Sequence, residues 1–252
     1  MPAAGARGNH RYCDRRSDSC LRGETSRATT ATLVELAGAA TASGIITGVG
    51  MNFRWAAPVR RIRTLLDGGA YGRPTAIAVR HVVSKPRGSM WGLSLLRSFL
   101  LAQAIHPVDL VLQLAGEPVV DAHVVRQSGS AGTMLGLRLG FAGGAVGSLI
   151  CGSQAARFES RVEVTSSSGA TMCITGLGEL IVTGGLVPSD IGDPRGWSQL
   201  WRPSPLDIGF DRTGFGAELA AFSRAAAAGA DFSPNLTGLL PTYGILDRIE
   251  EW

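Results

Sequence analysis

Residues 100–116 read LLAQAIHPVDLVLQLAG, and this stretch decides the fold. Apolar residues recur through it at helical spacing and Gly116 marks its end, so the pattern predicts a helix over about residues 94–114. The helix carries an imidazole at His106 and, three residues later, a carboxylate at Asp109. Residues three apart share a helix face, so this apolar helix also presents two titratable groups close together.

Upstream of this helix the sequence predicts two helices and two strands in alternation. Helical spacing begins near Thr29 and stops at Gly44, and the glycine-bounded apolar run IITGVGMNF, residues 45–53, predicts a buried strand. A helix over about residues 58–66 follows, because its first residue is a proline, which suits a first turn. Residues 75–83, TAIAVRHVV, predict the second strand.

Downstream the pattern changes to short β-type segments separated by glycine or serine turns. The predicted strands are VVDAHVVRQ (119–127), TMLGLRLGF (133–141), GAVGSLICGSQ (144–154), SRVEVTSS (160–167), GATMCITG (169–176) and GELIVTG (178–184). Residues 185–212 predict an irregular excursion, and helices over about 216–228 and 236–250 close the chain. Short links favour antiparallel pairing of neighbouring strands. The predicted fold is therefore α/β, more narrowly α+β, with a mostly antiparallel or mixed open sheet flanked by helices.

The composition describes a globular chain and limits its partners. The 252 residues are 45% apolar with a net charge of +4, but the basic residues are scattered, which argues against a nucleic-acid partner. No stretch reaches the roughly 18 apolar residues of a membrane span, and no hydrophobic signal core is present, so neither insertion nor export is expected. The four cysteines form no CxxC pair, so we expect no metal site and a reducing cytoplasm.

A nucleotide-binding motif is missing from the sequence. A dinucleotide site needs a glycine-rich turn between a strand and a helix, where backbone amides hold the pyrophosphate. No GxGxxG occurs, and the glycine clusters at residues 44–50 and 129–136 have spacings that suit turns and close strand packing. A P-loop is absent as well, because no glycine-lysine-serine or glycine-lysine-threonine triplet exists.

Three segments in order resemble the Gfo/Idh/MocA-type NAD(P)-dependent oxidoreductases. They are GVGMNFRWAAPVRRIRTLLDGGAYGRP (48–74), LLAQAIHPVDLVLQLAG (100–116) with the family's HxxD element, and GFGAELAAFSRAAAAG (214–229). The resemblance implies a substrate-binding domain whose open sheet serves oligomer contacts. It also implies NAD or NADP as cofactor, held by an N-terminal Rossmann domain, so this chain is not expected to bind the cofactor alone.

The resemblance divides the chain into three expected parts. Residues 1–23 are arginine-rich with few branched apolar residues, and predict a disordered tail that matches no family element, as expected if the chain's start lies elsewhere. Residues 24–54 would be a remnant helix and strand of the nucleotide-binding domain. Residues 55–252 would be the substrate-binding and oligomerisation domain.

The resemblance implies that His106 lies near the reacting carbon. Removing hydrogen from an alcohol requires a base for the hydroxyl proton, and an imidazole titrates near working pH. Asp109 either orients that ring or balances local charge. Two family groups are replaced: ETSRATT, residues 24–30, puts Thr25 at the position of the catalytic lysine, and Ala102 stands where an aspartate is common four residues before the histidine.

Three further residues are candidates for substrate binding. Arg54, in MNFRW, matches a family arginine near the domain junction, where it contacts substrate or pairs with a carboxylate. Lys85 is the single lysine and could supply the missing cation, although a solvated loop position explains it equally simply. Trp91 could line a pocket or serve as core or interface.

Three functions follow as hypotheses. The first is an oxidoreductase acting on a sugar or cyclic polyol, truncated so that the cofactor domain comes from another chain or a longer gene product. The second is a cofactor-independent enzyme, such as an isomerase, dehydratase or cyclase, that keeps His106. The third is a non-catalytic module that pairs with a full-length homologue through the sheet. The expected assembly is a homo-oligomer or such a pairing with a homologous subunit.

Overall fold

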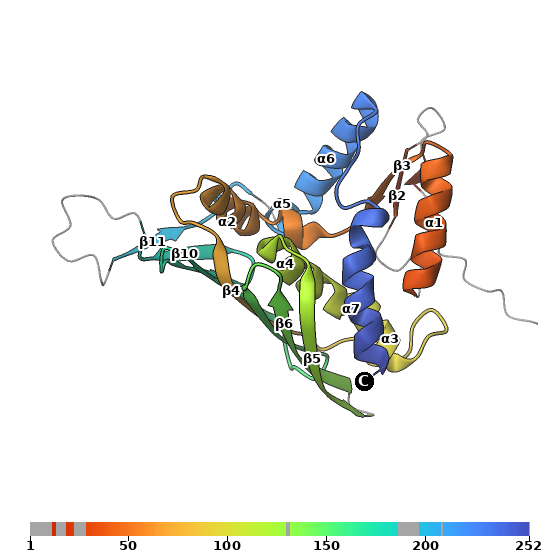
Figure 1. Cartoon of the computed structure of the whole chain (residues 1–252), viewed down its shortest axis with the longest axis horizontal. Coiled ribbons are helices and arrows are strands. Elements are labelled where there is room, and N and C mark those ends of the chain that lie inside the picture. Colours follow the sequence, from red (N-terminus) through yellow and green to blue (C-terminus); the bar gives the residue numbers. More distant parts are fainter. Residues whose placement is uncertain are drawn as a thin grey trace, which may run out of the picture.

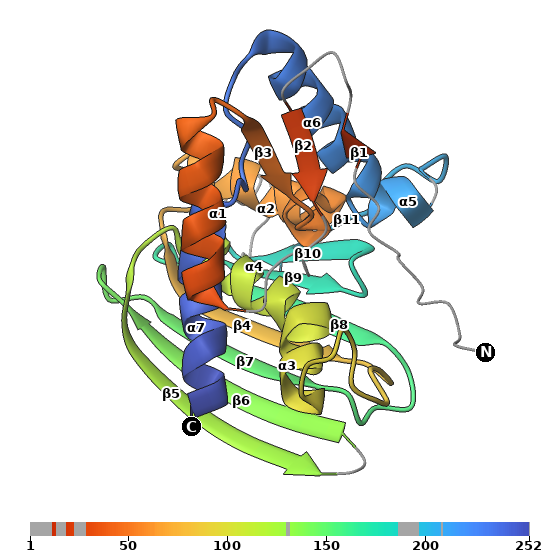
Figure 2. The ribbon, with the colours of Figure 1, turned by 90° about the vertical axis from the view of Figure 1, so that its right-hand side faces the viewer.

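The computed structural model describes residues 12–13, 19–22, 29–129, 132–185, 197–207 and 209–251. A large curved sheet carries its helices on one face, and a small second sheet lies beyond those helices (Figures 1 and 2). The long helical stretch predicted around His106 lies between the two sheets. It consists of α3 (Leu95–Phe99), the π-helical turn η2 (Leu100–Ala104) and α4 (Ile105–Ala115).

The large sheet is mixed and mostly antiparallel, as the sequence predicts. Its spatial order is β11-β10-β9-β8-β4-β7-β6-β5, and β4 with β7 is its parallel pair. The strands are β4 (Pro74–Val82), β5 (Val119–Gly129), β6 (Gly132–Phe141), β7 (Val146–Gly152), β8 (Glu159–Ser166), β9 (Thr171–Thr175), β10 (Glu179–Thr183) and β11 (Ser198–Trp201).

Alternation along the strands separates a buried face from an open one. In β4, Ile77, Val79 and His81 point to the helices, while Arg80 points away from them. The buried face packs against α2 (Ala57–Asp67) and α4. The continuous helix Leu95–Ala115 is long and apolar enough to cross a membrane, but 67% of its most apolar window is buried, so it is a core helix.

The small sheet includes six residues of the segment 1–23 that the sequence predicts to be disordered. Strands β1 (Tyr12–Cys13) and β2 (Ser19–Arg22) form there, and β2 pairs parallel with β3 (Ile46–Val49). Backbone hydrogen bonds along the edge of β3 order them, which needs no apolar side chains. The other residues of 1–23 lie outside the described residues. With α1 (Thr30–Ala42) between β2 and β3, this part is a β-α-β unit.

The segment after β3 departs from the prediction. The expected strand through residue 53 ends at Val49, and a 3-10 turn, η1 (Asn52–Trp55), follows it. The turn is held against the start of α6 (Phe215–Ala228), where Gly214 has φ 94°. A Cβ at Gly214 would lie 2.1 Å from the Asn52 carbonyl oxygen, so only glycine permits this close approach.

The C-terminal elements connect both sheets. Within the predicted irregular excursion, β11 joins the large sheet and α5 (Gly209–Arg212) forms a short helix, while residues 186–196 lie outside the described residues. A 3-10 turn, η4 (Thr237–Leu239), leads into α7 (Leu240–Glu251), which packs on α1 and α4. Asp247 ties three helices together, because it pairs with buried Arg97 of α3 at 2.7 Å and accepts the Thr30 backbone N–H of α1 at 3.0 Å.

Candidate active site

Four rings, Phe53, His81, His106 and Phe158, form what we call the imidazole cluster. Phe53 of η1 lies between the two histidines, with ring centroids 5.5 Å from His81 and 5.1 Å from His106. Phe158, just before β8, meets the His81 ring edge-on at 5.5 Å. The cluster therefore joins the ends of β3 and β4 to the first turn of α4.

His81 is the functional candidate that sequence reasoning missed. It is 2% exposed, and burial together with the nearby His106 lowers its pKa from 6.5 to about 4, against the opposing effect of a hydrogen bond with Gln103. Apart from this contact, neither of its ring nitrogens has a well-formed hydrogen bond with a described residue. The period-two pattern of β4 could have found it, because His81 continues the inward series of Ile77 and Val79.

The π-helical turn immediately before His106 is the second unusual feature. Turns of this kind insert one extra residue into a helix and are frequent at functional sites. This one, η2, contains half-buried Ala102 and Gln103, so an amide lies near His81 at the turn where the resemblance led us to expect an aspartate. His106 itself is half-buried at the start of α4.

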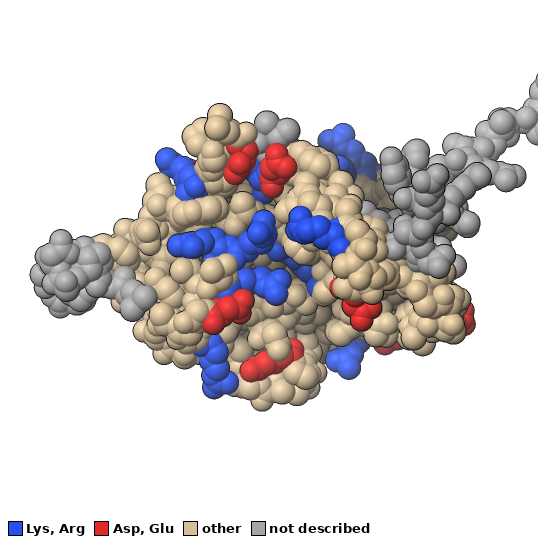
Figure 3. Space-filling model, turned by 90° about the horizontal axis from the view of Figure 1, so that it is seen from above, with Lys and Arg blue, Asp and Glu red and all other residues tan. Residues whose placement is uncertain are grey.

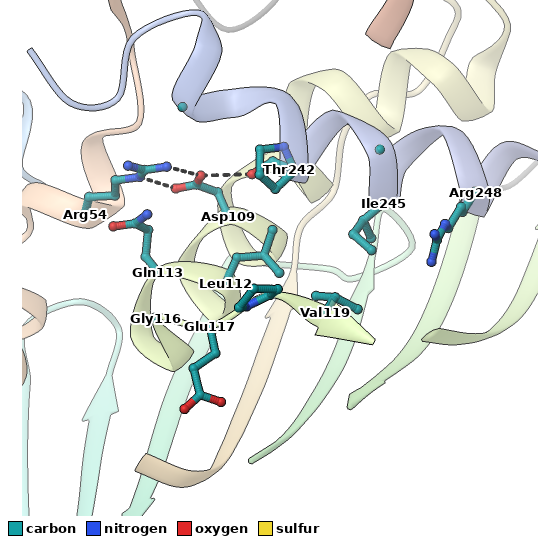
Figure 4. Close-up of a pocket in the computed structure, with 14 residues that line it drawn as sticks. Arg54, Asp109, Leu112, Gln113, Gly116, Glu117, Val119, Thr242, Ile245 and Arg248 are labelled. Atoms are coloured by element: carbon teal, nitrogen blue, oxygen red, sulfur yellow. Dashed lines mark hydrogen bonds and ion pairs between the residues drawn. The ribbon is translucent and has the colours of Figure 1, made fainter. Parts of the chain in front are cut away.

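Asp109 is paired with Arg54 (Figure 4). Arg54 donates from Nε to Oδ2 at 2.6 Å and from Nη2 to Oδ1 at 2.5 Å, and Thr242 of α7 donates its hydroxyl to Oδ1 at 3.1 Å. Arg54 is 5% and Asp109 1% exposed. The structure thus shows Arg54 paired with a carboxylate, while a substrate contact by Arg54 and a catalytic role for Asp109 stay predictions.

The ion pair lies at one end of a hollow between α4 and α7. Its volume is about 600 Å³, and its wall includes Leu112, Ile245 and Arg248 (Figure 4). Both members of the pair line this hollow, but their mutual hydrogen bonds hold η1, α4 and α7 together. Asp109 therefore positions α4, and with it His106.

Lys85 and Trp91 lie on the loop between β4 and α3. Lys85 is exposed and forms no ion pair with any described residue. Trp91 is 50% exposed and adopts φ 56°, a strained conformation for a tryptophan. The loop is fastened at Met90, whose backbone N–H donates to the Ser98 hydroxyl at 2.8 Å. Thr25, at the position of the family lysine, lies outside the described residues.

A dinucleotide does not fit the residues that the structure describes. The N-terminus of α1 follows β2 in a β-α-β unit, which is where a pyrophosphate would bind in a nucleotide domain. Instead of a glycine-rich turn, Thr29 caps this helix, and its side chain and that of Thr32 form a reciprocal capping box.

Comparison with known proteins identifies the class of domain. Residues 59–171 match the family model described as the GFO/IDH/MocA C-terminal domain. A dehydrogenase from Chromobacterium violaceum is 32% identical, with a TM-score of 0.87 over 92% of this chain and 68% of that one. The chain belongs to the Gfo/Idh/MocA family, and its large sheet with the covering helices is the C-terminal domain of that family.

More distant structures share the fold. UDP-N-acetylglucosamine 3-dehydrogenase GnnA from Acidithiobacillus ferrooxidans is 16% identical with a TM-score of 0.73, over 92% of this chain and 70% of that one. Levoglucosan dehydrogenase in complex with NADH and L-sorbose is 20% identical with a TM-score of 0.76, over the same shares. No curated protein sequence matches the chain.

Proposed function

We propose that this chain is the substrate-binding part of an NAD(P)-dependent oxidoreductase that acts on a sugar or cyclic polyol. The observation that carries the proposal is His106, half-buried at the start of α4, with the Phe53 ring and neutral His81 beside it. An imidazole in this place can accept the proton of a substrate hydroxyl. Relatives with the same fold include sugar dehydrogenases, which supports the substrate class.

The other residues divide into binding and positioning roles. Lys85 and Trp91, on their exposed loop, are proposed contacts for substrate hydroxyls and for the apolar face of a sugar ring. Arg54 and Asp109, which the sequence predicts as a substrate contact and a catalytic group, are paired with each other, and we propose that this pair also fixes α4. NAD or NADP is proposed to come from a nucleotide-binding domain outside the described residues, on a longer product or a partner chain.

A specific observation favours a second candidate. Threonine at position 25 cannot supply a cation, and alanine at 102 cannot supply a carboxylate, so two of the family's catalytic groups are replaced. A cofactor-independent isomerase, dehydratase or cyclase would need only His106 as its acid or base. Activity without nicotinamide that disappears in His106→Ala would favour this candidate over the oxidoreductase.

The open face of the large sheet is the proposed partner surface. Exposed apolar side chains on it include Val125, Ile150 and Ile181. A homo-oligomer, or pairing with a full-length homologue, would cover them. A non-catalytic pairing module is favoured if the purified chain assembles with such a homologue and neither the chain alone nor the complex converts a substrate. The cytoplasmic location stays a prediction.

The proposal is tested by titrating the 252-residue protein with NADH, NADPH and polyols, including L-sorbose and myo-inositol. We expect no nucleotide binding up to about millimolar, equivalent to about 4 kcal/mol, and saturable polyol binding that is lost in His106→Ala. His123→Ala, which removes an exposed imidazole on β5, should bind normally. Micromolar NADH binding would overturn the cofactor assignment, and unchanged polyol binding in His106→Ala would overturn the role of His106.

A further inference from the structure

The surface charge on the face seen in Figure 3 indicates no particular ligand. Basic side chains gather over the middle of this face, and acidic side chains lie around them, so the opposite charges partly offset one another. The loop between β4 and α3 is distinguished in another way. Its backbone holds one large aromatic side chain, Trp91, half exposed at the surface.

Residues 90–93 of this loop, which we call the Trp91 turn, form a tight turn. The backbone N–H of Leu93 donates to the Met90 carbonyl oxygen at 2.9 Å. Both central residues are left-handed, with φ 56° at Trp91 and 75° at Gly92, as in a type I′ turn. Glycine, asparagine and aspartate favour these positions, whereas a tryptophan at the first one is strained. The turn therefore needs support from other residues to keep this conformation.

Two contacts support the turn, one at each end. The Ser98 hydroxyl, buried in α3, accepts the Met90 backbone N–H at 2.8 Å and donates to the Ser94 carbonyl oxygen at 2.8 Å. At the other end, the Leu93 side chain packs against the core. The Trp91 ring is 50% exposed, so its own burial does not offset the strain. The contacts at the two ends fix the backbone, and the ring projects from between them.

The Trp91 turn is attached to the same helical stretch as the proposed base. The loop begins just after β4, which carries His81, and ends at α3, which continues through η2 to His106. Ser98 and His106 are about two helical turns apart, roughly 12 Å along the axis. Ser98 therefore fixes Trp91 relative to the helix that carries His106.

We propose that Ser98 is a positioning residue that holds the Trp91 ring as a preformed surface for the apolar face of a sugar ring. The inference rests on the proposed function, which puts a sugar or polyol beside His106. An aromatic ring that is fixed before binding loses little conformational freedom when a ligand packs on it. Affinity then depends on the turn as well as on the ring.

The order of the Trp91 ring tests the positioning role. In a proton–nitrogen correlation spectrum, Trp91→Phe identifies the Trp91 indole signal by its disappearance. We expect the wild-type heteronuclear NOE of this signal to be close to that of Trp55, whose indole nitrogen is buried. Ser98→Ala removes the acceptor of the Met90 N–H, so the Trp91 NOE should fall to that of a mobile side chain. Ser94→Ala removes an exposed hydroxyl that caps α3 without contacting Met90, and should leave the NOE unchanged.

A second pair of variants perturbs the turn without changing its buried support. Gly92→Ala puts a Cβ on a left-handed residue, and Gly88→Ala makes the same change in the same loop at a residue that is not left-handed. Neither Cβ would meet another atom within 4 Å, so the two variants differ in backbone strain. Gly92→Ala should lower the Trp91 NOE, and Gly88→Ala should not.

Titration with myo-inositol and L-sorbose, followed at the Trp91 signal, tests the link to binding. We expect saturable shifts in the wild type. The dissociation constants should be at least 5-fold higher in Ser98→Ala and Gly92→Ala, and less than 2-fold higher in the controls Ser94→Ala and Gly88→Ala.

Three results would overturn the proposal. The first is a Trp91 NOE that is the same in the wild type and in Ser98→Ala. The second is a mobile Trp91 with unchanged affinity, or equal weakening in Ser94→Ala; polyol binding that still depends on His106 would then leave the proposed function standing. The third is a wild type that binds neither polyol, because the proposed function then fails and the sugar-binding role of Trp91 fails with it.

Discussion

Replacing Asp109 with alanine isolates what the buried ion pair contributes to stability. The substitution removes both acceptors of the Arg54 guanidinium and the acceptor of the Thr242 hydroxyl. Arg54 stays 5% exposed and charged, because arginine does not deprotonate in proteins. Leaving one partner of a buried pair uncompensated costs about 3–5 kcal/mol, which is about two to four powers of ten in the unfolding equilibrium.

Urea unfolding followed by tryptophan fluorescence measures this loss. With a slope of about 3 kcal/mol per molar urea, the midpoint should fall by about 1–1.7 M. The matched double variant Arg54→Met with Asp109→Leu removes both charges and should recover most of that loss, since apolar replacements of buried pairs are often neutral. Glu163→Ala breaks the exposed pair with Arg161, 2.9 Å long, and should cost less than about 1 kcal/mol.

The reasoning fails if Asp109→Ala costs no more than the exposed-pair control. It fails as well if the double variant is as unstable as the sum of its single substitutions, because the cost would then come from lost packing and not from an unpaired charge. In either case the assignment of Asp109 as a positioning residue would be wrong, and a direct role beside His106 would have to be reconsidered.

Three further predictions follow. The pKa of His81 is about 4 in the folded protein and 6.5 in the unfolded chain, so the free energy of unfolding should fall as the pH falls below 6.5, by about 2 kcal/mol between pH 7.5 and 5. In urea titrations at several pH values, His81→Phe should remove this pH dependence and His123→Gln should keep it. Asp247→Ala should cost about 2 kcal/mol and speed amide exchange at the start of α1, unlike Glu251→Ala at the exposed end of α7. Gly214→Ala should cost more than about 3 kcal/mol, seen as a lower melting temperature, because its Cβ has no room.

Periodicity predicted the large sheet and its covering helices because burial acts on every residue of those elements. The strand pattern over residues 119–184 gives β5 to β10 in order, and the apolar helix around His106 lies where the spacing places it. The strands that the sequence did not predict lie outside the regions of regular apolar spacing. Strand β2 pairs with the backbone of β3, and β11 pairs with the backbone of β10. Pairing through the backbone at a strand edge gives no hydrophobic pattern that the sequence would show.

The site was predicted less completely, because its contacts join residues far apart in the sequence. Arg54 and Asp109 were both identified, but nothing in one segment shows that the other is its partner. His81 was overlooked because a histidine in the apolar run AIAVRHVV suggests a tolerated core residue.

The π-helical turn bears most directly on function. A single-residue insertion in the hydrogen-bond ladder has no reliable sequence signal, yet here it precedes His106 and carries Gln103 toward His81. Alanine at position 102 therefore does not leave this turn without polar groups, because the Gln103 amide and the His81 imidazole lie near His106, the proposed base. Whatever reaction the assembled protein performs, proton transfer at His106 would take place next to these two groups and not next to a carboxylate from this turn.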